Sequence, residues 1–169
     1  MKLHIGGEEK KEGWKIFNIK KSDNVDYVGD IRDLSQFEEN IVDEIYASHV
    51  IEHIPLKDAE KTFKGIYRIL KENGKFYISV PDMDILFNMF LHSKAPLKAK
   101  YDIMRIIFGG QQNDFDYHYY GWNFEFLKNY LRASGFRKAE RVKSFSMFND
   151  TSDFAIYGQT ISLNLIAYK

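Results

Sequence analysis

The chain has 169 residues, enough for one domain with a buried core. Its 24 basic and 24 acidic residues cancel, so it lacks the basic excess that duplex-binding proteins use against phosphates. Without cysteine it forms neither disulfides nor thiolate metal sites. No stretch has the apolar length of a signal peptide or membrane span, and we expect a soluble cytoplasmic protein without nucleic-acid or membrane partners.

Strand and helix patterns alternate along the first half of the chain. Runs of β-branched and aromatic residues predict strands at 2–5, 14–19, 25–29, 42–47 and 75–81. Pro55 is expected to start an amphipathic helix, because apolar residues then recur every three or four positions, and Asn73–Gly74 is expected to end it. This order of strand, helix and strand predicts an α/β domain with a largely parallel sheet.

The second half is predicted to hold helices, an aromatic loop and two last strands. Residues 82–108 are expected to be helical, and Asn123 is expected to cap a helix over 124–134. Alternation predicts strands at about 137–146 and 156–168. Between the helices, residues 108–126 are rich in aromatic side chains and broken by glycine. This stretch is predicted to be a lid or pocket wall, and equally an aromatic loop packed on the sheet or a dimer contact.

A short segment matches the H-x-x-E-H pattern of inverted zinc proteases through His49, Glu52 and His53. Two histidines four apart bind one metal only when they share a helix face. Here the pattern follows a predicted strand, and Pro55 disfavours helical backbone just before it. The other sources of a third ligand are a distant carboxylate and the remaining histidines His4, His92 and His118. Nothing marks one of them, so we predict no metal site and rank a zinc hydrolase last.

Several segments together resemble class I S-adenosylmethionine-dependent methyltransferases, in particular small ones of glycan and small-molecule pathways. They are LHIGG (3–7), GDIRDL (29–34), VDEIYASHVIEHIP (42–55), RILKENGKFYISVPD (68–82), IFGGQ (107–111) and DYHYYGWNFEFLKNYLRASGF (116–136). The resemblance implies a Rossmann-like, doubly wound, mostly parallel seven-stranded sheet with an antiparallel C-terminal strand and helices on both faces. It implies a single domain over 1–169 with a lid or insertion at about 82–122.

The same resemblance implies an activity and a cofactor. S-adenosylmethionine would donate a methyl group to oxygen or nitrogen of a small molecule or sugar, leaving S-adenosylhomocysteine. Ligands of such sheets bind outside the carboxyl ends of the strands. The implied cofactor-binding residues follow strands one to four and are Gly6, Gly7, Glu8, Asn18, Asp30, Ile31, Ser48, His49 and Glu52. Asp30 is expected to accept a hydrogen bond from the adenine amine, and His118 and His53 are the candidate catalytic bases.

Three features depart from the family pattern. Glu8 stands where the family has a further glycine, and Asn18 stands where it has the acid that binds the ribose hydroxyls. About eight residues join the first two strands, fewer than a parallel crossover usually needs. An open cleft is therefore expected, which a second copy of the chain would close as a homodimer. The alternative function is a catalytically degenerate methyltransferase-like protein that acts as a binding or regulatory subunit.

Overall fold

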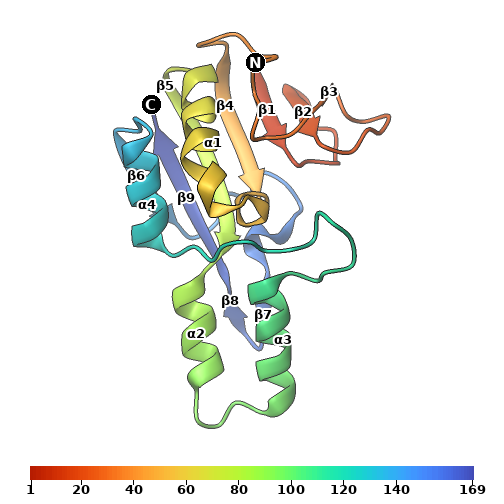
Figure 1. Ribbon diagram of the computed structural model, residues 1–169, viewed down its shortest axis with the longest axis vertical. Coiled ribbons are helices and arrows are strands. Elements are labelled where there is room, and N and C mark those ends of the chain that lie inside the picture. The colour runs from red at the N-terminus through yellow and green to blue at the C-terminus, as the bar shows by residue number, and fades with distance from the viewer.

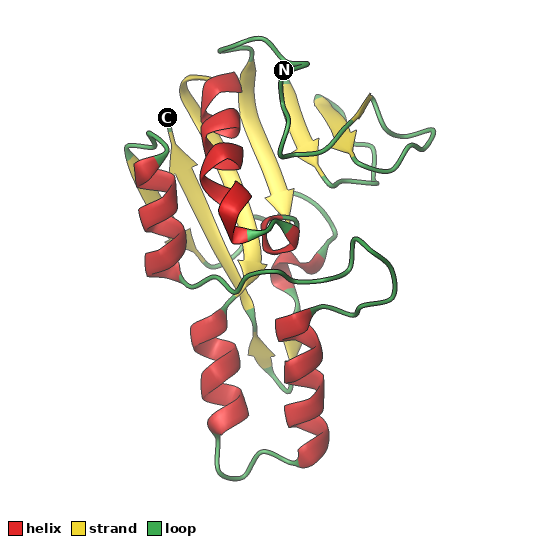
Figure 2. Ribbon diagram, in the orientation of Figure 1, coloured by secondary structure: helices red, strands yellow, loops and turns green.

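A seven-stranded sheet forms the centre of the computed structural model, which describes residues 1–169 (Figures 1 and 2). Its strand order is β3-β2-β1-β4-β5-β9-β6. Neighbouring strands run parallel, except that β9 is antiparallel to both β5 and β6. The strands of this sheet are β1 (Lys2–Ile5), β2 (Trp14–Asn18), β3 (Tyr27–Val28), β4 (Val42–Ser48), β5 (Leu70–Pro81), β6 (Lys138–Val142) and β9 (Ser162–Tyr168). The predicted mostly parallel α/β fold with an antiparallel C-terminal strand is confirmed.

Four α-helices and two short 3₁₀ helices complete the fold. They are α1 (Leu56–Ile69), α2 (Met83–Leu91), α3 (Leu97–Phe108), α4 (Phe124–Ala133) and the 3₁₀ helices Ile51–His53 and Thr151–Asp153. The apolar side chains of α1 and α4 pack on one face of the sheet. There Phe63 and Leu131 join a core of 26 buried residues that also includes Leu3, Ile45 and Phe76 from the strands. Asn123 caps α4 as predicted, because its side chain accepts the N–H of Phe126.

The opposite face of the sheet has an aromatic cover. Side chains alternate along a strand, so His4 and Tyr46 point away from the face that holds Leu3 and Ile45. They pack against the connection between β6 and β9, where the ring of Phe148 lies 4.0 Å from that of His4 and 4.8 Å from that of Tyr46. We expected helices on both faces, but here the cover contains only the 3₁₀ helix Thr151–Asp153.

The first crossover explains this difference. Residues 6–13 alone connect β1 to β2, and the two strands nevertheless pair in parallel, Lys2 opposite Trp14. That connection is too short to hold a helix of ordinary length and still return to the start of the sheet. The segment after β6 therefore fills the space that a crossover helix would cover.

Two expected boundaries were wrong. Helix α1 ends at Ile69 rather than at Asn73–Gly74, because Leu70 takes an extended conformation and pairs with Val42 at the start of β5. Asn73, with φ of 64°, belongs to an irregularity inside that strand, where the register shifts.

The predicted strand over 156–168 is interrupted. Residues 155–160 instead form the hairpin of β7 (Ala155–Ile156) and β8 (Gln159–Thr160). Tyr157 and Gly158 have φ of 50° and 79° and make its two-residue turn. Only the segment from Ser162 joins the main sheet as β9.

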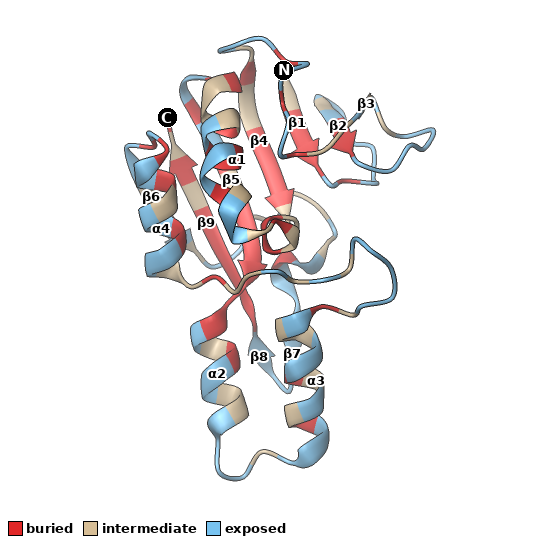
Figure 3. Cartoon of the chain, viewed as in Figure 1, coloured by how far each residue is buried: buried red, intermediate tan, exposed pale blue.

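Helices α2 and α3 project beyond the end of the sheet (Figure 1). Buried Asp82 accepts the backbone N–H groups of Asp84 and Ile85 at the start of α2 and pairs with Arg141 at 2.5 Å. The far ends of both helices are exposed, with Leu91 and Leu97 75% and 84% accessible (Figure 3). No helix combines the length and apolar character needed to cross a bilayer.

The buried imidazole of His4 makes stability depend on pH. Burial, the largest cause, lowers the pKa of His4 from 6.5 to about 4. Between these values the unfolded chain binds more protons, so this contribution is complete above about pH 6.5 and lost as the pH falls to 4. We expect a loss of about 3 kcal/mol over that interval. Denaturant unfolding of the wild type and His4→Phe at a series of pH values measures it.

The His4→Phe variant keeps an aromatic ring and removes the titrating group. Its unfolding free energy is expected to vary less between pH 6.5 and 4 than that of the wild type. His92→Asn is the matched control, because His92 is exposed at the end of α2. An equal pH dependence in the wild type and His4→Phe would contradict the assignment.

Candidate functional site

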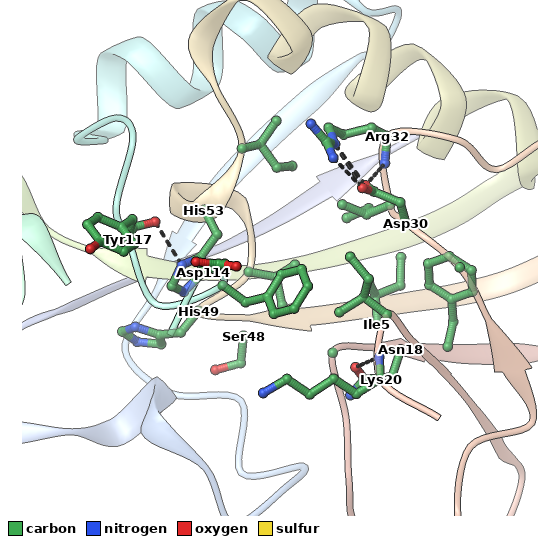
Figure 4. Close-up of a pocket in the computed structure, with 18 of the residues that line it drawn as sticks. Ile5, Asn18, Lys20, Asp30, Arg32, Ser48, His49, His53, Asp114 and Tyr117 are labelled. Atoms are coloured by element: carbon green, nitrogen blue, oxygen red, sulfur yellow. Dashed lines mark hydrogen bonds and ion pairs between the residues drawn. The ribbon is translucent and has the colours of Figure 1, made fainter. Parts of the chain in front are cut away.

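A cleft of about 340 Å³ lies at the carboxyl ends of β1, β2 and β4 (Figure 4). Its volume is within the range of small-molecule sites. Residues from the strand ends form one side, and residues 114–119 form another. The predicted site residues that line it are Gly6, Glu8, Asn18, Asp30, Ile31, Ser48, His49 and His53. Gly7, Glu52 and His118 do not line the cleft and lie behind or beside its wall.

The glycine turn after β1 is fixed by contacts within the protein. Gly6 has φ of 76°, and a Cβ there would lie 2.5 Å from a methyl carbon of Val50. A Cβ on Gly7 would lie 2.4 Å from the ring of His4. Neither position accommodates a side chain, so the turn brings bare backbone to the cleft at Gly6, whereas Gly7 serves packing against His4.

Asn18, at the end of β2, fastens this turn. Its Nδ2 donates to the carbonyl of Gly7 at 3.1 Å, and its Oδ1 accepts the backbone N–H of Lys20 at 3.0 Å. The side chain is only 9% exposed. Both halves of the amide are therefore engaged inside the protein, which explains why asparagine rather than an acid occupies the position.

Asp30 follows β3 and binds Arg32. The Arg32 Nε lies 3.0 and 2.9 Å from the two carboxylate oxygens, and the backbone N–H of Arg32 donates to Oδ1 at 2.9 Å. The side-chain hydrogen bonds of Arg32 are the main reason that the pKa of Asp30 is lowered. Asp30 is thus an ionised carboxylate at the cleft, already held in position by a cation (Figure 4).

A buried pair of opposite charges lies at the end of β4. Nδ1 of His49 is 3.1 Å from Oε1 of Glu52, and Nε2 of His49 is 3.1 Å from the hydroxyl of Ser162. Burial would lower the pKa of His49, but its contact with Glu52 and the charge of that carboxylate outweigh burial and raise it. Burial would likewise raise the pKa of Glu52, and the contact and charge of His49 reverse this. We therefore describe the pair as imidazolium and carboxylate.

His53 and His118 lie next to this pair. Their ring centroids are 4.7 Å apart in an edge-to-face arrangement. Nδ1 of His53 lies 3.0 Å from the carbonyl of Tyr117 (Figure 4), so this nitrogen donates and Nε2 carries the lone pair. Burial lowers the pKa of His118, and its Nδ1 is buried without a hydrogen-bond partner.

The zinc-protease geometry of H-x-x-E-H is absent. His49 has φ of 53° and precedes the 3₁₀ helix Ile51–His53, so the pattern does not lie on an α-helix. His49 and His53 therefore do not share a helix face, and the argument against that motif is supported by the backbone.

Residues 108–126 divide into a cleft wall and a piece of core. Phe115, Tyr117 and Tyr119 line the cleft, whereas Trp122 is fully buried and packs edge to face on Phe63. The backbone N–H of Tyr119 donates to the carbonyl of Glu52 at 2.9 Å, which attaches the wall to the end of β4. Both predicted roles, pocket wall and packed aromatic loop, thus occur in successive parts of one stretch.

Sequence reasoning missed several residues of the cleft. They are the apolar Ile5 and Phe17 and the charged Lys20, Arg32 and Asp114. Lys20 is the most informative, because its ammonium lies 5.7 Å from the centroid of the Phe115 ring across the cleft entrance. The signal was available, since Lys20 directly follows the second strand, which was predicted at 14–19.

A larger hollow of about 560 Å³ lies between α2, α3 and residues 157–159. It is lined by side chains such as Ile85, Met89 and Ile103 and is far from the strand ends. Polar side chains such as Asn88 and Gln159 also line it, but none of its lining residues comes from the carboxyl ends of β1 to β4, so we assign the functional site to the smaller cleft.

Residues 9–78 match the family model described as a methyltransferase domain. The cleft lies at the carboxyl ends of β1, β2 and β4, with Asp30 reaching it from the segment after β3, and the antiparallel strand β9 lies between β5 and β6. The match covers less than half of the 169 residues, so it shows that this segment is similar to methyltransferase domains, and the sheet order agrees with the class I S-adenosylmethionine-dependent fold that the sequence resembles. S-adenosylmethionine is the cofactor of this family.

Solved methyltransferase structures share the fold at low sequence identity. One, from Archaeoglobus fulgidus, is described as a SAM-dependent methyltransferase; it is 17% identical with a TM-score of 0.61, over 99% of this chain and 85% of that one. Another is the Burkholderia thailandensis 1,6-didemethyltoxoflavin-N1-methyltransferase, solved with 1,6-didemethyltoxoflavin and S-adenosylhomocysteine. It is 14% identical with a TM-score of 0.60, over 99% and 70% of the two chains. No curated protein matches this chain in sequence.

The cleft has groups that suit S-adenosylmethionine. Ile5, Ile31 and Phe115 give it apolar surface, and Asp30 is an ionised acceptor beside them. Gly6 presents backbone without a side chain, and the hydroxyl of Ser48 is buried without a hydrogen-bond partner. Accessible backbone, apolar walls and an unpaired hydroxyl suit S-adenosylmethionine, which combines a nucleoside with a charged methionyl group.

Restoring the family's acid at position 18 is expected to destabilise the protein. Asn18→Asp replaces the donor to the Gly7 carbonyl with a carboxylate oxygen, which leaves that carbonyl unpaired and adds repulsion. We expect a loss of about 1–3 kcal/mol in the free energy of unfolding, measured with denaturant at neutral pH.

Asn24→Asp provides the matched control. The Asn24 amide donates to the carbonyl of Glu8 at 3.0 Å, in an exposed place. This change is expected to cost under about 1 kcal/mol. Equal losses at the two positions would show that the Asn18 contact has no special importance.

Proposed function

We propose that this chain transfers a methyl group from S-adenosylmethionine to oxygen or nitrogen of a small molecule or sugar. The observation that carries the proposal is the convergence of Gly6, Asp30 and Ser48, from the ends of three different strands, on one cleft. Bound S-adenosylmethionine supplies a methyl group already activated by its sulfonium. The chain then has to hold donor and acceptor in line, which accounts for large accelerations without a covalent intermediate.

The residues of the cleft have distinct proposed roles toward the cofactor. Asp30, with Ile31 beside it, holds the adenine end, where the carboxylate accepts from an amine. Gly6 and Ser48 lie next to the middle of the cleft. Lys20 and Glu8 are a cation and an anion that suit the carboxylate and the ammonium of the methionyl group, respectively. In this arrangement Glu8 replaces the missing glycine without opposing the ligand's charge.

The acceptor is proposed to bind beside the wall 114–119. Phe115, Tyr117 and Tyr119 offer aromatic faces for a sugar or planar ring. His53 lines the cleft with the lone pair of Nε2 unpaired, so it is the candidate that accepts a proton from a hydroxyl or ammonium. His118 contacts the ring of His53 and takes part through it. A homodimer that closes the cleft remains a prediction.

Asn18 favours a second candidate, a methyltransferase-like binding subunit without catalysis. Both ends of its amide are engaged, so it offers less to the ribose hydroxyls than a free carboxylate would. The cofactor would then be held weakly or not at all, and the cleft would serve another ligand. Direct binding of the cofactor product separates the two candidates.

We expect isothermal titration calorimetry to show micromolar binding of S-adenosylhomocysteine by the wild type. Asp30→Ala is expected to weaken it at least about tenfold, because a charge-assisted hydrogen bond is lost. Asp33→Ala is the matched control, since Asp33 lies nearby and outside the cleft. No binding at millimolar ligand would reject the cofactor site and favour the binding subunit.

His118→Ala is expected to lower turnover at least about a hundredfold while changing the Kd of S-adenosylhomocysteine less than threefold, because His118 packs against the ring of His53 and positions that base toward the acceptor. Turnover is measured as S-adenosylhomocysteine formed with a panel of phenols, amines and sugars. His92→Ala, outside the cleft, should leave turnover unchanged. Unaltered turnover in His118→Ala would reject its role.

A further inference from the structure

Beside the cleft, three side chains place polar atoms close to one another. One oxygen of Glu52 and one ring nitrogen each of His53 and His118 all lie within 4.8 Å of one another. Glu52 and His53 are neighbours in the chain, whereas His118 comes from the wall segment after α3. The cluster therefore forms only when the wall is in place against the end of β4.

The hydrogen bonds in this cluster leave the inward atoms free. Glu52 has no exposed surface, and apart from the ion pair of Oε1 with His49 at 3.1 Å its carboxylate has no partner. Nδ1 of His118 is also buried and unpartnered. Nδ1 of His53 is used by the carbonyl of Tyr117, which leaves Nε2 with a lone pair. Buried polar atoms without partners are rare in folded proteins and call for an explanation.

A divalent cation would supply the missing partner. We propose that Glu52, His53 and His118 bind one first-row transition-metal ion, with Zn²⁺ the best match. Two imidazoles and one carboxylate are a known zinc donor set, and imidazole favours such metals over Mg²⁺ or Ca²⁺. The three side chains leave a further coordination position for water or another oxygen.

The geometry requires a small closure of the cluster. Zinc bonds of about 2.0–2.1 Å place ligand atoms of a tetrahedral site ~3.3 Å from each other. The donor atoms span up to 4.8 Å, so binding shortens the distances between them by up to about 1.5 Å. His49, 3.1 Å from Oε1 of Glu52, holds the carboxylate from the other side and acts as a positioning residue.

The site differs from the zinc-protease pattern by one ligand. The sequence pattern names His49, Glu52 and His53, whereas the structure brings His118 to the other two and leaves His49 behind Glu52. Because His53 also lines the cleft, the ion would lie at the boundary between cluster and cleft. Resting on the proposed methyl transfer, an acceptor hydroxyl bound at the open position would lose its proton to water more readily, and His53 would then serve as a metal ligand in place of its role as the base.

Metal binding is testable without cofactor or acceptor. Protein purified without a histidine tag is stripped with chelator, dialysed and titrated with Co²⁺, whose visible absorption reports nitrogen and oxygen ligation. We expect one equivalent to bind, Zn²⁺ to displace it, and elemental analysis to give one zinc per chain. We also expect the unfolding temperature to rise with Zn²⁺.

Two variants test the ligands and one serves as control. His118→Asn and Glu52→Gln are each expected to weaken Co²⁺ binding at least about tenfold. His92→Asn, outside the cluster, should bind as the wild type does. If Glu52→Gln fails to fold, His118→Asn still decides, because its side chain comes from the wall and not from the end of β4.

The possible results separate this proposal from the proposed function. Less than stoichiometric binding by the wild type, or undiminished binding by His118→Asn, would overturn the metal site and leave methyl transfer untouched. Stoichiometric binding that is lost in the variants would establish the site even if S-adenosylhomocysteine does not bind.

Discussion

The arrangement of this molecule depends on the contact between Asn18 and Gly7. Eight residues at most separate β1 from β2, so the chain must reverse twice without a helix and still return the second strand in parallel. The Asn18 amide bridges the Gly7 carbonyl and the Lys20 backbone N–H. This bridge holds the carboxyl ends of β1 and β2 side by side. The cleft, the position of Lys20 and the exposure of the Gly6 backbone all follow from that bridge. A group used to hold the turn is no longer fully available to a ligand.

A buried charge is the second constraint. Glu52 has no solvent contact, and an isolated carboxylate in such a place would be strongly destabilising. His49 offsets part of this cost from one side, and His53 and His118 face the carboxylate from the other. Three histidines around one acid are hard to explain by packing alone. The cost is instead typical of functional sites, where groups are held in unfavourable surroundings because their chemistry needs it.

Much of this could be predicted from sequence, and the exceptions have physical causes. The strands and the helix cap at Asn123 depend on local conformational preferences, so a few neighbouring residues are enough to predict them. The end of α1 was misplaced because Leu70 suits both a helix stripe and a buried strand, and pairing with Val42 decides between them. At the site, residues after strand ends were found because a parallel sheet brings them together. The partnership of Glu52 with His118 joins residues 66 positions apart through a loop without regular structure, and no spacing rule reveals that.

The attachment of the wall to β4 has a consequence for motion. Two contacts, from the Tyr119 N–H to the Glu52 carbonyl and from His53 to the Tyr117 carbonyl, tie residues 117–119 to the segment that carries the buried acid. Swinging the wall outward would break both and admit water to Glu52. Any group that stabilises the buried carboxylate of Glu52 therefore also favours the closed position of residues 117–119. By thermodynamic reciprocity, a molecule that holds these residues closed strengthens the binding of an ion at Glu52. Binding in the cleft and binding at the cluster, which share His53, are therefore expected to strengthen each other.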